Sequence, residues 1–168
     1  MVIPDPHVAP DDERQILLAE LDHQRAIVVR KASGLTDEQA ATSLVPSLTT
    51  VTGLLQHLAL VERAWFRKTF AGDGWTWSYD FESDQDAEFR VTAETSLAAA
   101  IADYEAACNE SRQAYANASL NDFAHEERER PPQRSTLRWI VVHLIAETAR
   151  HNGHLDILRE QLDGAMGE

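Results

Sequence analysis

Two side chains near the C-terminus, Glu147 and His151, have the types and the spacing to chelate a metal ion. They are four residues apart, so on a helix they lie one turn apart and their side chains can converge on one point. On a helical wheel centred on Leu144, both fall inside the apolar stripe, within about 60° of its centre. A buried carboxylate without a partner is costly, so such a glutamate pairs, takes up a proton or coordinates a metal.

A third ligand has to come from another helix, and His57 is the candidate. It lies at the edge of the apolar stripe of its own segment, beside Val61, and faces either the core or a groove between helices. His57, Glu147 and His151 together supply two nitrogens and one oxygen, a set that zinc accepts while keeping a fourth position for water or substrate. The alternative is that Glu147 and His151 form only the hydrogen bond that this spacing commonly allows.

The other histidines are weaker candidates. His143 and His154 lie one turn to either side of the pair, and each is an alternative ligand or an outer partner. We expect His154 to pack or hydrogen-bond beside the site without coordinating. Glu20-x-x-His23 matches half of a di-iron carboxylate motif, whose second copy is missing.

Two further segments are expected to be structural. Asp122-x-x-His125 lies in a charged stretch and is interpreted as a solvated loop. Cys108, the single cysteine, rules out an internal disulfide and lies on the apolar side of its helix, where we expect it to pack. The sequence also lacks a phosphate-binding glycine loop, a dinucleotide-binding glycine pattern and a His-Glu-x-x-His helix. The sequence therefore indicates no second kind of chemistry beside the candidate metal site.

Composition narrows the class of protein. The 168 residues fit a single domain, residues 1–168, with an ordered core at about 12–163. The net charge of −13 repels phosphate backbones, so nucleic acid is not an expected partner. The N-terminus has no signal-like apolar region, and no apolar run approaches the ~20 residues that cross a bilayer. We therefore expect a cytoplasmic protein without a membrane partner.

Helix signals divide the chain into four long helices. A short capping box, Thr36 to Gln39, lies between the first two. Ser135, after the helix-stopping prolines 131 and 132, is the expected N-cap of the last helix. The expected helices span about residues 12–32, 47–70, 92–118 and 135–162. An all-α four-helix bundle is the expected fold class.

The connection from 72 to 90 is unusually long for a compact domain and carries Trp75, Trp77, Tyr79 and Phe81. One interpretation is a crossover that packs through its aromatic side chains. The other is a lid or wall of a ligand pocket, because long loops in compact domains are often functional. The sequence leaves both interpretations open.

Several of these segments resemble the DinB superfamily, in particular an actinobacterial branch of it, and the resemblance covers about residues 12–163. The most specific piece is the helical His151 followed by Asn-Gly-His-Leu. The segments that carry the likeness are GLTDEQA at 34–40, LLQHL at 54–58, VERAWF at 61–66 and ETARHNGHLDILRE at 147–160.

The resemblance implies a four-helix bundle with a long crossover between helices two and three, often assembled as a homodimer. It also implies a metal triad of one histidine in the second helix and two ligands four residues apart in the fourth. His57 and His151 match this triad directly. Glu147 stands where many members carry histidine, but the mycothiol-dependent maleylpyruvate isomerase branch also uses His, Glu and His. The implied cofactor is a divalent ion, with zinc expected and nickel the alternative.

The characterised relatives are transferases or isomerases that act with mycothiol, bacillithiol or glutathione. The implied function is therefore a metal-dependent S-transferase or isomerase that uses a low-molecular-weight thiol and a small-molecule substrate. The alternative is a metal-binding stress-response or structural protein without catalysis. A hydrolase using metal-bound water would need an acid or base that the sequence does not identify. For the transferase, an arginine such as Arg150 is a candidate contact for an anionic substrate.

Overall fold

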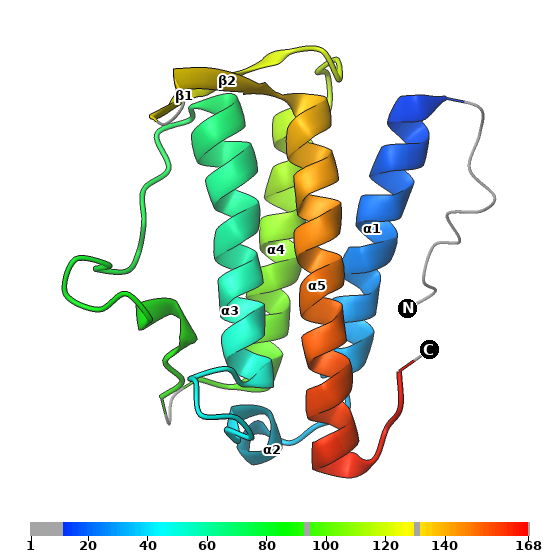
Figure 1. Ribbon diagram of the computed structural model, residues 1–168, viewed down its shortest axis with the longest axis vertical. Coiled ribbons are helices and arrows are strands. Elements are labelled where there is room, and N and C mark those ends of the chain that lie inside the picture. The colour runs from blue at the N-terminus through cyan, green and yellow to red at the C-terminus, as the bar shows by residue number, and fades with distance from the viewer. Residues whose placement is uncertain (1–11, 93–94, 130–131, 168) are drawn as a thin grey trace.

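A computed structural model describes residues 12–92, 95–129 and 132–167 as a helical bundle with a small hairpin at one end (Figure 1). The long helices α1, α3, α4 and α5 form the bundle, and a short helix α2 precedes α3. The predicted all-α four-helix bundle is confirmed. The elements are α1 Glu13–Ala32, α2 Asp37–Ala41, α3 Val51–Glu62, a π-helical continuation Arg63–Ala71, a 3-10 turn Ala87–Phe89, α4 Leu97–Tyr115, β1 Phe123–Glu129, β2 Pro132–Thr136 and α5 Leu137–Asp163.

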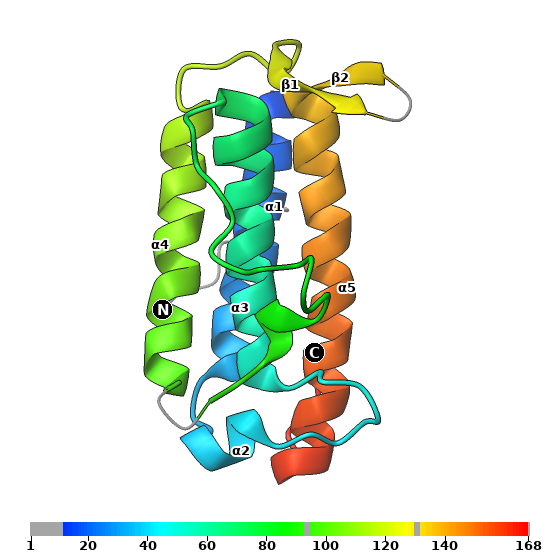
Figure 2. The same cartoon turned by 90° about the vertical axis from the view of Figure 1, so that its left-hand side faces the viewer.

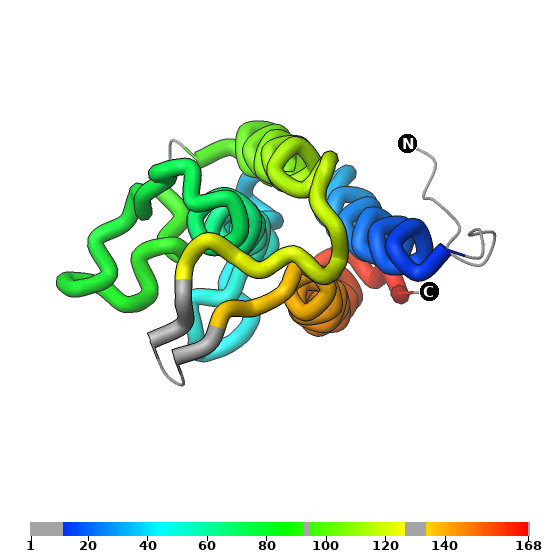
Figure 3. The backbone as a smooth tube through the Cα atoms, turned by 90° about the horizontal axis from the view of Figure 1, so that it is seen from above, coloured from blue at the N-terminus to red at the C-terminus, as the bar shows by residue number. Residues whose placement is uncertain are grey.

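The arrangement of the helices places α3 directly beside α5. Seen along the bundle axis, the four long helices occupy the corners of a quadrilateral, with α3 and α5 as one neighbouring pair and α1 and α4 completing it (Figure 3). Figure 1 shows that α3 and α5 run in opposite directions. The middle of one therefore faces the middle of the other. Within the described ranges, no helix is long and apolar enough to span a membrane.

Helix starts follow from side chains that cap exposed amides. The predicted capping box of α2 is present, with Gln39 N 3.2 Å from Thr36 Oγ1 and Thr36 N 2.9 Å from Gln39 Oε1. The last helix, in contrast, is capped by Thr136 and not by the predicted Ser135. Ser135 and Thr136 both belong to β2, and it is Thr136, the last residue of the strand, whose side chain accepts from the amide of Trp139 at 3.3 Å.

Two predicted helices were too long at their start. The second begins at Val51 and not near Ser47, because the Thr50 side chain accepts from the amide of Gly53 at 3.0 Å. The third begins at Leu97 and not near Thr92, because Ser96 caps it. It also ends at Tyr115, a few residues before the predicted Ala118. A capping side chain fixes the residue at which a helix begins, whereas apolar spacing alone does not locate that residue.

The interpretation of Asp122 to His125 as a loop is wrong beyond its first residue. Residues from Phe123 form strand β1, which pairs antiparallel with β2, with an irregular register between Phe123 and Glu127. The hairpin closes the end of the bundle where α5 begins (Figures 1 and 2). A charged stretch lacks the alternation of apolar and polar residues that identifies a half-buried strand, so the sequence did not predict this strand.

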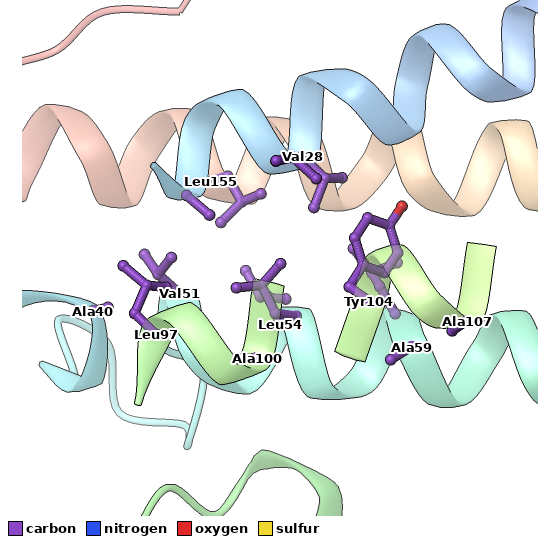
Figure 4. Close-up of a cluster of buried hydrophobic side chains, with 14 of the residues drawn as sticks. Val28, Ala40, Val51, Leu54, Ala59, Leu97, Ala100, Tyr104, Ala107 and Leu155 are labelled. Atoms are coloured by element: carbon purple, nitrogen blue, oxygen red, sulfur yellow. The ribbon is translucent and has the colours of Figure 1, made fainter. Parts of the chain in front are cut away.

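Two apolar clusters fill the bundle. One lies toward the end near α2 and includes Val28, Leu54, Leu155 and Tyr104 (Figure 4). The other lies toward the hairpin and centres on Phe66. Cys108 packs in the first cluster as predicted. Burial raises its pKa to about 12, which keeps the thiol protonated.

Candidate metal centre

The three predicted ligands lie together between α3 and α5. The Nε2 atoms of His57 and His151 approach the same oxygen, Oε1 of Glu147, at 3.7 and 3.2 Å. One candidate ligand atom from each residue lies within 4.8 Å of the other two. Side-chain exposure is 16% for His57, 16% for Glu147 and 11% for His151, so the cluster is sheltered but reaches solvent.

The spacing of these atoms fits a small divalent cation. Two ligands about 2.1 Å from a tetrahedral zinc ion lie about 3.4 Å apart, and the two distances to Glu147 bracket this value. Two imidazole nitrogens with one carboxylate oxygen are a donor set that zinc accepts. The residues present therefore fit the implied ion.

The electrostatics favour the protonation states that ligands need. Burial opposes ionisation of Glu147, but His151, Arg150 and His57 outweigh it and hold the pKa of the carboxyl below its usual range. Burial and the neighbouring His57 lower the pKa of His151, against the opposing effect of Glu147. At neutral pH the site therefore offers an ionised carboxylate and a neutral imidazole, the forms that bind metal.

His57 is oriented by the crossover, which the sequence did not reveal. Its Nδ1 atom lies 2.9 Å from Oε1 of Glu88, and its ring stacks on Phe89 with centroids 5.0 Å apart. An Nδ1–H that donates to a carboxylate leaves Nε2 free to coordinate and fixes the ring orientation. Glu88 is thus the outer partner of the candidate centre, contributed by the 3-10 turn.

The 3-10 turn is held against α3 by hydrogen bonds from a side chain of α3 to the backbone of the turn. The Gln56 side chain donates to the carbonyls of Glu88 at 2.8 Å and Arg90 at 3.3 Å. Gly53 permits this close approach, because a Cβ there would lie 3.2 Å from the carbonyl oxygen of Phe89. Figure 2 shows the crossover descending over the outer side of α3 to this turn.

Two further residues of α5 complete the surroundings. Nδ1 of His154 lies 3.2 Å from Nδ1 of His151, on the side of the ring away from Glu147, as expected for a non-coordinating neighbour. Arg150 is exposed and donates to the second oxygen of Glu147 at 2.8 Å. One oxygen of Glu147 therefore faces the two imidazoles, while the other accepts from the exposed guanidinium of Arg150.

The remaining sequence candidates lie elsewhere. His143 stacks on Trp139, with ring centroids 5.0 Å apart, and meets Trp65 edge-on. Glu20 accepts a hydrogen bond from Gln24 at 2.8 Å. Among the described residues, the three predicted ligands are the only group of histidine, cysteine and carboxylate side chains with metal-like spacing.

The aromatic crossover residues do not face this cluster. Trp75 and Tyr79 line a hollow of about 210 Å³ together with Gln56, Arg63 and Asp103. None of the candidate ligands lines that hollow. The part of the crossover that contacts the cluster is the turn at Glu88 and Phe89, several residues later in the chain.

The architecture and the His–Glu–His cluster define a DinB-type helical bundle. The profile of the mycothiol-S-transferases matches residues 16–164, nearly the whole chain. The chain belongs to the mycothiol-S-transferase family, which confirms the resemblance to the DinB superfamily.

A solved structure supports the fold. The chain is similar to a protein described as the conserved protein of locus from Enterococcus faecalis, with a TM-score of 0.61 and 22% sequence identity. The alignment covers 93% of this chain and 100% of the other. No curated protein matches the sequence.

Proposed function

We propose that the protein is a metal-dependent S-transferase that joins a low-molecular-weight thiol, mycothiol or a close analogue, to a small electrophile. The observation that carries the proposal is the convergence of two imidazoles on one carboxylate oxygen in a cluster that is partly exposed to solvent. Membership of the mycothiol-S-transferase family supports the thiol as one substrate.

We assign His57, Glu147 and His151 as the ligands of one divalent ion, with zinc as the expected metal. A bound divalent ion would favour the thiolate form of a coordinating thiol at neutral pH, the form that attacks electrophiles. Glu88 holds the tautomer of His57, and His154 adjoins the outer nitrogen of His151. The protein residues thus supply a fixed ligand set with one side open for substrate.

Arg150 is the candidate for binding an anionic group on a substrate. Its guanidinium is exposed and lies 2.8 Å from the outer oxygen of Glu147. A long, exposed arginine can leave a partner that a metal ion already neutralises and turn to a substrate anion. The homodimer that the family resemblance implies stays a prediction.

Cobalt-substituted protein provides the test. Adding thiol should produce an intense near-ultraviolet band from sulfur-to-cobalt charge transfer, and His57→Ala should abolish it. His143→Ala is the matched control, since it removes an imidazole of α5 that packs on Trp139 and Trp65 and does not touch the ligand set. If no thiol changes the cobalt spectrum at millimolar concentration, the transferase proposal fails and a non-catalytic metal-binding role replaces it.

A further inference from the structure

A pocket of about 250 Å³ lies between α5 and the loop that joins α2 to α3. Figure 2 shows this loop passing beside α5. None of the three candidate metal ligands lines it. Its lining residues are Val45, Ser47, Thr49, His154, Ile157 and Leu158.

The pocket is adjacent to the candidate metal centre. His154 is part of its wall, and the Nδ1 atom of His154 lies 3.2 Å from that of His151. From His151 to Ile157 the helix rises about 9 Å, at 1.5 Å per residue. A molecule that reacts beside His151 and extends along α5 therefore reaches the pocket with a tail of about that length.

The chemistry of the lining selects an uncharged group. Among the described residues that line the pocket, none is a lysine, arginine, aspartate or glutamate. Its two hydroxyls, of Ser47 and Thr49, lie 2.9 Å apart and bond to each other. Val45 and Ile157 are 36% and 54% exposed, which leaves apolar surface that a ligand would cover.

We infer that this pocket binds the apolar tail of the electrophilic substrate, an uncharged alkyl chain or single ring attached about 9 Å or less from the reacting carbon. This inference rests on the proposed S-transferase function. It assigns the pocket to the electrophile, because the mainly apolar wall offers few partners for the polar groups that a small hydrophilic thiol carries.

A binding experiment tests the pocket without any turnover. We expect 4-fluorobenzyl alcohol, followed by ¹⁹F NMR, to bind the metal-loaded protein. Ile157→Glu should weaken this binding by about tenfold or more, since it places a carboxylate where an apolar ring has to sit. Ile16→Glu is the matched control, because Ile16 is similarly exposed at 43% but lies on α1. Equal binding by wild type and Ile157→Glu, or no binding at all, overturns the inference.

A kinetic experiment separates this inference from the proposed function. In a series of 2-alkenals, the thiolate sulfur bonds to the β-carbon, the π electrons move to the α-carbon, and that carbon takes a proton from solvent. Each added methylene should raise kcat/KM about three- to fourfold until the pocket is full. Ile157→Glu should flatten this dependence.

The two arms give distinguishable failures. If no alkenal is turned over but the fluorinated probe binds and Ile157→Glu weakens it, the pocket stands and the S-transferase function fails. If turnover occurs without dependence on chain length, and Ile157→Glu keeps full probe binding, the function stands and the assignment of the pocket fails.

Discussion

Two glutamates of the bundle, Glu62 and Glu147, lie among polar partners but in different surroundings. Glu62, the last residue of α3, is 1% exposed and lies inside the core. Glu147 has a side-chain exposure of 16% and lies between α3 and α5. Both are carboxylates on helices of the bundle, but they differ in burial and in their partners.

The Glu62 cluster is closed. Both of its oxygens pair with Arg25, at 2.7 and 2.6 Å, in a bidentate ion pair. Arg25 also donates to Asp22 and to the hydroxyl of Tyr115, and Glu62 outweighs the effect of burial and raises the pKa of Arg25 further. The charge of the carboxylate is matched within the protein, which leaves no donor atoms for a ligand.

The Glu147 cluster is open. Its inner oxygen faces two imidazoles, and among the described side chains its guanidinium partner is the exposed Arg150. A cation placed among these three groups would be held by all of them. The contrast separates a charge pair that holds the fold together from a proposed ligand set, and each prediction below tests one side of it.

The largest effect is expected from breaking the buried ion pair between Glu62 and Arg25. Glu62→Leu leaves the buried Arg25 with only the partly exposed Asp22 as counter-ion and should lower the free energy of unfolding by about 3–5 kcal/mol. Urea denaturation followed by circular dichroism measures it. The double variant Arg25→Met/Glu62→Leu should recover most of the loss, because no charge is then left unpaired. A loss below about 1 kcal/mol in Glu62→Leu would contradict the importance of the pair.

Removing a ligand from the open cluster should release the metal. Wild-type protein is expected to carry close to one divalent ion per chain, and His151→Ala should lose most of it. The loss should exceed the about 10–100-fold in affinity that an outer partner is worth. Elemental analysis after dialysis measures the content. His143→Ala and His23→Ala should stay loaded, and a fully loaded His151→Ala would show that the assigned triad is wrong.

The outer partner should matter less than a ligand. Glu88→Ala should weaken metal binding by about 10–100-fold, because His57 loses the acceptor that fixes its ring. Glu88→Gln should lose less, since an amide oxygen still accepts from Nδ1–H. Competition with a chromophoric chelator measures the affinity. Glu82→Ala removes an exposed carboxylate from the same crossover as a control, and an equal loss there would refute a specific role for Glu88.

The smallest effect is expected from exchanging one ligand type for another. Glu147→His should retain the metal, because imidazole also suits zinc. Glu147→Leu should weaken the metal but leave the apo protein as stable as wild-type apo, since packing replaces a half-buried charge. Thermal unfolding of the apo proteins provides the comparison with Glu62→Leu. A marked fall in the apo melting temperature of Glu147→Leu would show that Glu147 stabilises the fold as Glu62 does, which would contradict the contrast between them.

The sequence by itself identified what local geometry controls. The i, i+4 spacing of Glu147 and His151 places them on one face of any helix, and the capping box at Thr36 and Gln39 uses atoms three residues apart. His57 was selected from its position on an apolar stripe, and the three side chains do lie together. That they hold a metal stays a prediction.

The tertiary structure alone decided which distant residues meet. Glu88 lies 31 residues from His57, and Arg25 lies 37 residues from Glu62. Neither separation corresponds to a helical or strand periodicity, because such pairs depend on how the crossover and the helices pack. The hairpin and the pocket beside Ile157 arose in the same way, from backbone pairing and loop placement that hydrophobic spacing does not encode. Helical spacing fixes neighbours within a turn or two, whereas packing of the whole chain fixes the rest.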